Sequence, residues 1–171
     1  MHVLQWIAIK NDTDDPADAV QSVTSFLEQE LNPGSSWFDW FVTGGGRWNP
    51  EGDGYNDGAT NMVISLEEHG LSAIQEKIDW AIEARMREFA DYTKDIDFSG
   101  IQDKLNSYNG TMDYSFDLYP LNRAIEMLQG NWDFNSYFYD AENYSTNPKW
   151  LLDKIASGDV DWYLVPVDFH F

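Results

Sequence analysis

The apolar and polar positions of the first half of the chain predict alternating strands and helices. Residues 3–9 are apolar on both strand faces, which is typical of a covered interior strand. Residues 37–43 are expected to form a strand with Phe38, Trp40 and Val42 on one face and Trp40 in the core. Residues 60–66 are expected to form another strand, with Met62, Ile64 and Leu66 aligned. A capped helix is expected from Asp15 until the Pro33-Gly34 pair.

Helical periodicity is strongest over residues 70–96. Its apolar positions fall in one narrow stripe and are expected to be buried: Leu71, Ile74, Ile78, Ile82, Phe89, Tyr92 and Ile96. Arg85 projects beside this stripe, so its side chain either extends to solvent or meets a buried carboxylate.

The second half alternates short helices with aromatic, acidic segments. Helices are expected over 99–108, 120–129 and 147–158, a possible strand over 112–118, and a strong strand at the C-terminus from Trp162 to Phe171. Pro166 cannot donate to a strand ladder, so this last strand is expected at a sheet edge.

The order of these elements predicts an α+β fold with a ferredoxin-like βαββαβ core. The whole chain, 1–171, is expected to form a single domain. Residues 1–98 and 159–171 would form the core, and 99–158 would be an α-rich insertion before the last strand. In this topology the last strand lies beside the first and antiparallel to it.

Charge is the most extreme property of the sequence. Thirty carboxylates against ten lysines and arginines give a net charge of −20, and 16 % of the residues are aromatic. Such a charge repels nucleic acid and anionic membranes and attracts basic surfaces. It is equally compatible with a purely solubilising role, whereas the aromatic content argues against a disordered chain.

Cysteine is absent from all 171 residues, so disulfides, zinc–thiolate sites and cysteine nucleophiles are excluded. No apolar run is long enough for a membrane span, and the N-terminus lacks the pattern of a signal peptide. A cytoplasmic location in a host cell is therefore expected. No catalytic motif or cofactor motif is present, and we expect neither an enzyme nor a bound cofactor.

The segment from Trp37 to Trp48 contains a WxDW sequence followed by Gly45-Gly46-Arg47-Trp48, and the chain closes with a VDxH strand at 167–170. These residues resemble small, uncharacterised bacteriophage proteins. A third glycine and an acidic insertion after Trp48 depart from that pattern. The resemblance implies a phage or mobile-element origin and favours accessory roles such as countering host defence.

The glycine run 44–46 followed by Arg47 and Trp48 is a candidate anion site. Successive glycines let backbone N–H groups converge on a phosphate, and Arg47 would add a bidentate contact. The alternative is a flexible turn in which Arg47 pairs with a nearby acid. Neither a P-loop nor a dinucleotide fingerprint is present.

Two further groups of residues contain types that can bind metal ions. Asn49, Glu51 and Asp53 alternate like the start of a calcium loop, but Thr60 stands where a bidentate glutamate is needed. His2, Asp168 and His170 would approach one another if the terminal strands pair. They form either an acid–base or metal trio or a surface pair, and we predict no metal.

We expect a non-enzymatic interaction protein that binds a basic, nucleic-acid-binding host protein, such as a CRISPR or restriction effector, and blocks it, plausibly by DNA mimicry. It would bind neither nucleic acid nor membrane itself. The expected contact residues are carboxylates interleaved with aromatics: Asp53, Asp57, Asp113, Asp117, Asp133, Asp140 and Glu142. The alternatives are a phosphate- or nucleotide-binding protein using Gly44–Trp48, and a virion assembly role.

Overall fold

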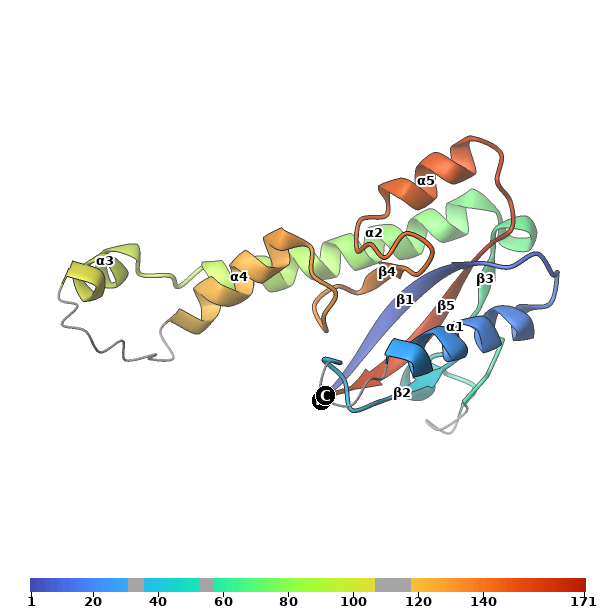
Figure 1. Ribbon diagram of the computed structural model, residues 1–171, viewed down its shortest axis with the longest axis horizontal. Helices are drawn as coiled ribbons and strands as arrows, with labels where there is room; N and C mark the ends of the chain where they lie inside the picture. Colours follow the sequence, from blue (N-terminus) through green and yellow to red (C-terminus); the bar gives the residue numbers. More distant parts are fainter. Residues whose placement is uncertain (31–35, 53–56, 107–117) are drawn as a thin grey trace.

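The computed structural model describes residues 1–30, 36–52, 57–106 and 118–171 (Figure 1). They form a mixed α+β structure with a five-stranded mixed sheet. The strands are β1 (His2–Lys10), β2 (Trp40–Thr43), β3 (Ile64–Ser65), β4 (Phe138–Asp140) and β5 (Trp162–His170). The helices are α1 (Pro16–Glu30), α2 (Leu66–Thr93), α3 (Phe98–Asn106), α4 (Tyr119–Gln129), α5 (Lys149–Ala156) and the 3-10 turn η1 (Gly46–Trp48).

Strand β5 lies inside the sheet, whose order is β2-β5-β1-β4, with β3 also paired to β5. The expected antiparallel pairing of the first and last strands is confirmed over the full length of β1, from His2↔His170 to Lys10↔Trp162. The prediction that Pro166 marks an edge strand is wrong. Its carbonyl accepts from the Gly44 N–H on the β2 side, so its missing N–H faces the break between β2 and β3, where no ladder bond is lost.

Each face of the sheet has its own core. On one face Ile7, Val165, Val167 and Phe169 pack with α1 residues such as Val23. On the other face the alternate positions of the same strands pack against α2 and α5. That second core contains Trp6, Ala8, Trp162 and Leu164 from the strands with Ile74, Ile78 and Leu151 from the helices. Successive side chains of a strand point to opposite faces of the sheet, and both faces are covered here. Strands β1 and β5 are therefore apolar at nearly every position.

The central part of the sequence differs most from expectation. The segment 60–66 gives only the two-residue strand β3, because Ser65 caps α2 by accepting from the Glu68 N–H. Strand β4 was missed, although it pairs in parallel with β1. Thus 99–158 supplies a sheet strand and the buried Leu151, and it shares a core with residues from 1–98. Most of the possible strand at 112–118 lies outside the described residues.

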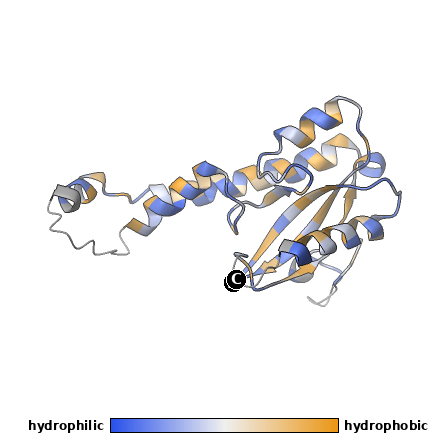
Figure 2. Cartoon of the chain, in the orientation of Figure 1, coloured by the Kyte–Doolittle hydropathy of each residue, from blue (hydrophilic) through white to orange (hydrophobic). Residues whose placement is uncertain are grey.

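Helix α2 extends beyond the sheet, and α4 returns alongside it (Figure 1). The stripe expected to be buried divides: Ile74 and Ile78 are fully buried, whereas Leu71 near the start of α2 and Ile82 farther along it are exposed. Along the projecting part, Figure 2 shows hydrophobic residues in both α2 and α4, and Ile82, Met86 and Leu128 are exposed there. None of the helices in the described ranges has the length and apolar character required to cross a membrane.

Candidate functional site

The glycine loop that joins β2 to η1 closes over an internal carboxylate. Gly44, Gly45 and Gly46 all have positive φ, which only glycine adopts without strain. The Arg47 N–H donates to Oδ2 of Asp168 at 3.1 Å, and a Cβ on Gly46 would lie 2.7 Å from the same oxygen. The loop thus approaches the protein's own Asp168, and Nε of Arg47 lies 3.9 Å from the same carboxylate, in agreement with the alternative of a turn in which Arg47 pairs with a nearby acid.

Asp168 is the centre of a group of residues at the end of the sheet, which we call the terminal cluster: His2, Asp39, Trp40, Arg47, Asp168 and His170. The Asp168 side chain is 1 % exposed, and its Oδ1 lies 3.0 Å from Nδ1 of His2. His170 stacks on Trp40 with ring centroids 5.0 Å apart, and its Nδ1 lies 3.2 Å from Asp39. The segment that follows Trp37 and the C-terminal strand therefore meet in space.

The expected proximity of His2, Asp168 and His170 is confirmed, and their geometry restricts what they can do. A carboxylate on Nδ1 fixes the ring orientation and leaves Nε2 for proton exchange. Across the four described ranges, no group of three or more His, Cys, Asp or Glu residues is placed to hold a metal ion. The expectation that Trp40 is a core residue is wrong, because its side chain is 38 % exposed at this surface.

Replacing Asp168 by asparagine is expected to destabilise the protein by about 1–3 kcal/mol, because one amide oxygen replaces the two carboxylate oxygens that face the Arg47 N–H and His2. The matched control is Asp39→Asn, which removes the 70 % exposed carboxylate beside His170. It is expected to change stability little. Urea unfolding of both variants tests this, and equal losses would contradict the central role of Asp168.

The long loop after β2 is held by its own polar side chains. Asn49 is buried, donates to the Gly44 carbonyl at 3.1 Å and exchanges hydrogen bonds with Asn61. Asp57 accepts from the backbone N–H and the hydroxyl of Thr43. Asp53 lies outside the described residues. The amide oxygen of Asn49, expected in the calcium-like pattern, accepts hydrogen bonds from Glu51 and Asn61 and so serves the loop itself.

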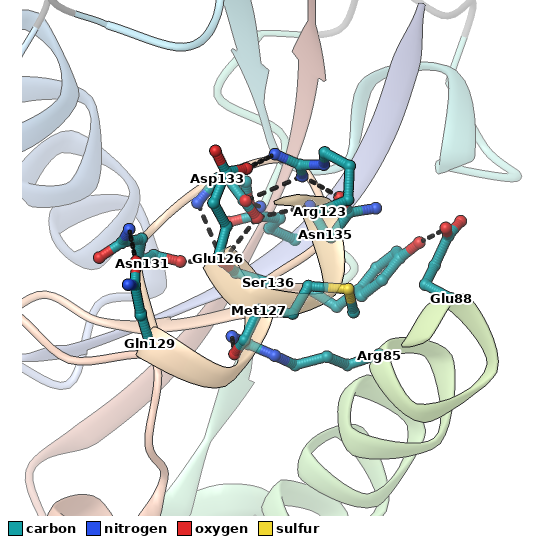
Figure 3. A network of polar contacts seen from close by, with 12 residues as sticks. Arg85, Glu88, Arg123, Glu126, Met127, Gln129, Asn131, Asp133, Asn135 and Ser136 are labelled. Atoms are coloured by element: carbon teal, nitrogen blue, oxygen red, sulfur yellow. Dashed lines mark hydrogen bonds and ion pairs between the residues drawn. The ribbon is translucent and has the colours of Figure 1, made fainter. Parts of the chain in front are cut away.

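Asp133 belongs to a buried ionic network rather than to an open acidic surface (Figure 3). Arg123 on α4 pairs with Asp133 at 2.9 Å, donates to Glu126 and Asn135, and stacks over Phe134. Burial opposes the charge of Arg123, but the facing Asp133 and Glu126 outweigh it and raise its pKa. The role expected for Asp133, a partner contact, is replaced by that of an internal counterion.

Asp140 is also a structural residue. It is fully buried and accepts from the backbone N–H groups of Glu142 and Asn143, which closes the turn after β4. Burial raises the pKa of Asp140, although these hydrogen bonds act in the opposite direction. Glu142, in contrast, is exposed, as expected. Asp113 and Asp117 lie outside the described residues.

Exposed and half-buried carboxylates gather at the opposite end of the sheet from the terminal cluster. We call this surface the acidic end and define it as Asp12, Asp14, Asp15, Glu67, Glu68, Glu142, Asp159 and Asp161. Lys10 ends β1 there and pairs with Asp159 and Asp161 at 3.1 and 3.7 Å. Asp14, Glu67 and Glu68 line a hollow of about 240 Å³ together with Ser65 and Tyr163.

The acidic end is not apparent from local sequence patterns, because its members come from four separate segments. The register supplies the connection: Lys10 pairs with Trp162, and Ser65 pairs with Tyr163. Both α1 and α2 begin here with acids in their first turns. Their positive dipole ends offset part of the repulsion between these carboxylates, by about 0.3–1 kcal/mol each. In the sequence, the acidic end is indicated by the concentration of acids in residues 11–15 (NDTDD) and 158–161 (GDVD).

Comparison with protein-family models, curated proteins and solved structures gives no match for this chain. Its function is therefore argued from its own residues.

Proposed function

We propose that this protein is a non-enzymatic interaction protein that binds a basic, nucleic-acid-binding host protein through the acidic end and blocks its nucleic-acid path. The observation that carries the proposal is the convergence of carboxylates at one end of the sheet. Within the described ranges Asp12, Asp14 and Glu67 form no hydrogen bond or ion pair through their carboxylates. These groups are free to meet basic side chains of a partner.

The acid-lined hollow also supports this proposal. Its volume of about 240 Å³ is open to a single long side chain, and Asp14, Glu67 and Glu68 surround it with negative charge. A partner arginine or lysine entering it would make charge-assisted hydrogen bonds, which are stronger than those between neutral groups. The net charge of −20 would speed such an encounter and make it sensitive to salt.

The remaining expectations fit this proposal without being required by it. The resemblance to small phage proteins directs attention to host defence proteins, such as CRISPR or restriction effectors, and to the host cytoplasm. A relation to ferredoxin-like folds is supported by the order of the elements from β1 to α2 and by the antiparallel pairing of β1 with β5. The internal position of β5 and the added β4 distinguish this sheet from the arrangement expected.

The proposal is tested with a variant that neutralises the acidic end by Asp12→Asn, Asp14→Asn, Glu67→Gln and Glu68→Gln. The control removes the same charge elsewhere, at exposed acids of α1 and around α2 and α3: Glu28→Gln, Asp91→Asn, Asp95→Asn and Asp103→Asn. The tagged native protein, incubated with nuclease-treated bacterial lysate, is expected to retain a nucleic-acid-binding protein. Binding should weaken at least about tenfold in the first variant, and little in the control.

Recovery of no nucleic-acid-binding protein, or binding that does not respond to salt, would reject this function. Equal weakening in both variants would show that total charge matters and the acidic end does not.

A phosphate- or nucleotide-binding role for Gly44–Trp48 receives narrower support. The side chain of Arg47 is 55 % exposed, and Trp48 is also exposed, so both are accessible to a ligand. The Arg47 N–H, however, already serves Asp168, whose buried negative charge would oppose a phosphate. Thermal stabilisation by a nucleotide that disappears in Arg47→Ala would favour this alternative.

A further inference from the structure

A groove lies between the projecting part of α2 and helix α4, away from the acidic end. Ile82, Met86 and Phe89 line one side of it, and Met127 and Leu128 line the other. Its volume is about 440 Å³. Met86 and Leu128 are 66 % and 75 % exposed, which is unusual for neighbouring apolar side chains of this size.

The charged residues of α2 near the groove are two arginines that have partners within the chain and two acids beside the exposed apolar side chains. Arg85 is drawn inward and donates to the backbone carbonyl of Met127. Arg87 pairs with Glu83 at 3.8 Å. Asp79 and Glu83 precede Ile82 and Met86 by three residues, so helical geometry places a carboxylate beside each exposed apolar side chain. The groove is thus apolar at its centre and carries acids along the α2 side.

The size of the groove decides between two classes of occupant. A stable interface between two folded proteins uses roughly 20–30 residues on each side. The groove has far fewer, and a second copy of the chain would bring its own charge of −20. The lining of α2 spans residues 82–90, a length of about 12 Å at 1.5 Å per residue, which matches a few turns of one helix.

We propose that this groove binds one amphipathic helix with a basic flank, presented by the partner protein. The apolar face of that helix would fill the space between Met86 and Leu128, as in other complexes in which a helix occupies an apolar groove. Its lysines or arginines would meet Asp79 and Glu83. The inference rests on the proposed function, since it supplies a second contact for the same basic partner.

The test uses a fluorescein-labelled helical peptide of about 12 residues, built of leucine, alanine and lysine so that it has one apolar and one basic face. Fluorescence anisotropy measures its binding to the intact protein. Met86→Glu and Leu128→Glu are each expected to weaken binding at least tenfold. Leu71→Glu is the matched control, because Leu71 is 49 % exposed on the same helix but outside the groove, and it should change binding less than twofold.

These variants separate apolar docking from simple charge attraction. Each adds a negative charge, so a peptide held only by charge would bind them as well as or better than the native protein. A scrambled peptide of the same composition is expected to bind at least tenfold more weakly. Equal binding of the scrambled peptide, or unchanged binding by Met86→Glu and Leu128→Glu, would overturn the inference.

The acidic-end variant distinguishes this inference from the proposed function. If the groove holds the peptide, neutralising Asp12, Asp14, Glu67 and Glu68 should leave its affinity within about threefold of native. Loss of peptide binding in that variant alone would refute the groove and leave the acidic end standing as the contact. Failure to recover a basic partner from lysate, with groove binding intact, would instead reject the proposed function.

Discussion

Gly44→Ala is expected to destabilise the protein by at least about 3 kcal/mol, whereas Gly58→Ala should cost only about 1–2 kcal/mol. The two glycines have nearly identical φ values, +81° and +82°. They differ in the space around them. A Cβ at position 44 would lie 2.6 Å from the backbone nitrogen of Ala59 and closer still to its carbonyl oxygen, whereas at position 58 no atom of the described residues lies within 4 Å.

The clash at position 44 has little room to relax. Gly44 donates its N–H to the carbonyl of Pro166 in the interior strand β5, which fixes it from the other side. Urea unfolding with matched m-values is the appropriate measurement, because it compares free energies of unfolding rather than yields. Equal losses for the two variants would mean that backbone conformation alone matters and that the loop does not pack as described.

Arg123→Met is expected to cost about 3–5 kcal/mol, the range observed when one member of a buried ion pair is removed. The change leaves Asp133 and Glu126 without their cation and removes the stacking on Phe134. Because Asp133 also accepts from the side chain of Gln5 through its backbone carbonyl, the damage should extend from α4 to β1. Chemical unfolding measures the loss, and hydrogen exchange should show weaker protection in α4 and β4.

Two further variants identify the cause of that loss. Arg87→Met removes an arginine that is 65 % exposed and whose only ion pair in the described chain is with Glu83, so its effect on stability should be small. The double variant Arg123→Met with Asp133→Asn should recover part of the stability lost by Arg123→Met, because the uncompensated buried charge is gone. A double variant as unstable as the sum of its single changes would contradict a direct pairing.

The terminal cluster shows which contacts of this protein could be predicted from local sequence patterns. The glycines predicted a loop that approaches an anion, and the pairing of the terminal strands predicted that His2, Asp168 and His170 would meet. The meeting of these three residues is confirmed, whereas the acid that the glycine loop approaches is internal, as in the alternative in which Arg47 pairs with a nearby acid. The identity of the anion could not be predicted, because Asp168 lies more than a hundred residues from the loop and reaches it only through the register of β2 with β5.

Contacts between distant segments also explain why the acidic surface differs from the one expected from the sequence. Asp133 and Asp140 occur in a segment that reads as polar and aromatic, but β4 carries Asp140 into the sheet and buries it, and Asp133 is largely covered where it pairs with Arg123. Strand β4 has only three residues, which is too short for an alternating pattern to reveal it. The acidic end was not predicted because its carboxylates are neighbours only after β1, β3 and β5 have paired.

The sequence by itself determined the class of the fold, the two apolar terminal strands, the helices α1, α2 and α4, and the strongly acidic character, because these depend on local periodicity and composition. Tertiary structure alone decided that Pro166 sits in an interior strand, that Arg123 is buried, and that α2 keeps Ile82 and Met86 exposed beyond the sheet. Each of these depends on which distant segment packs against the residue, and hydrophobic periodicity along the chain carries no information about that neighbour.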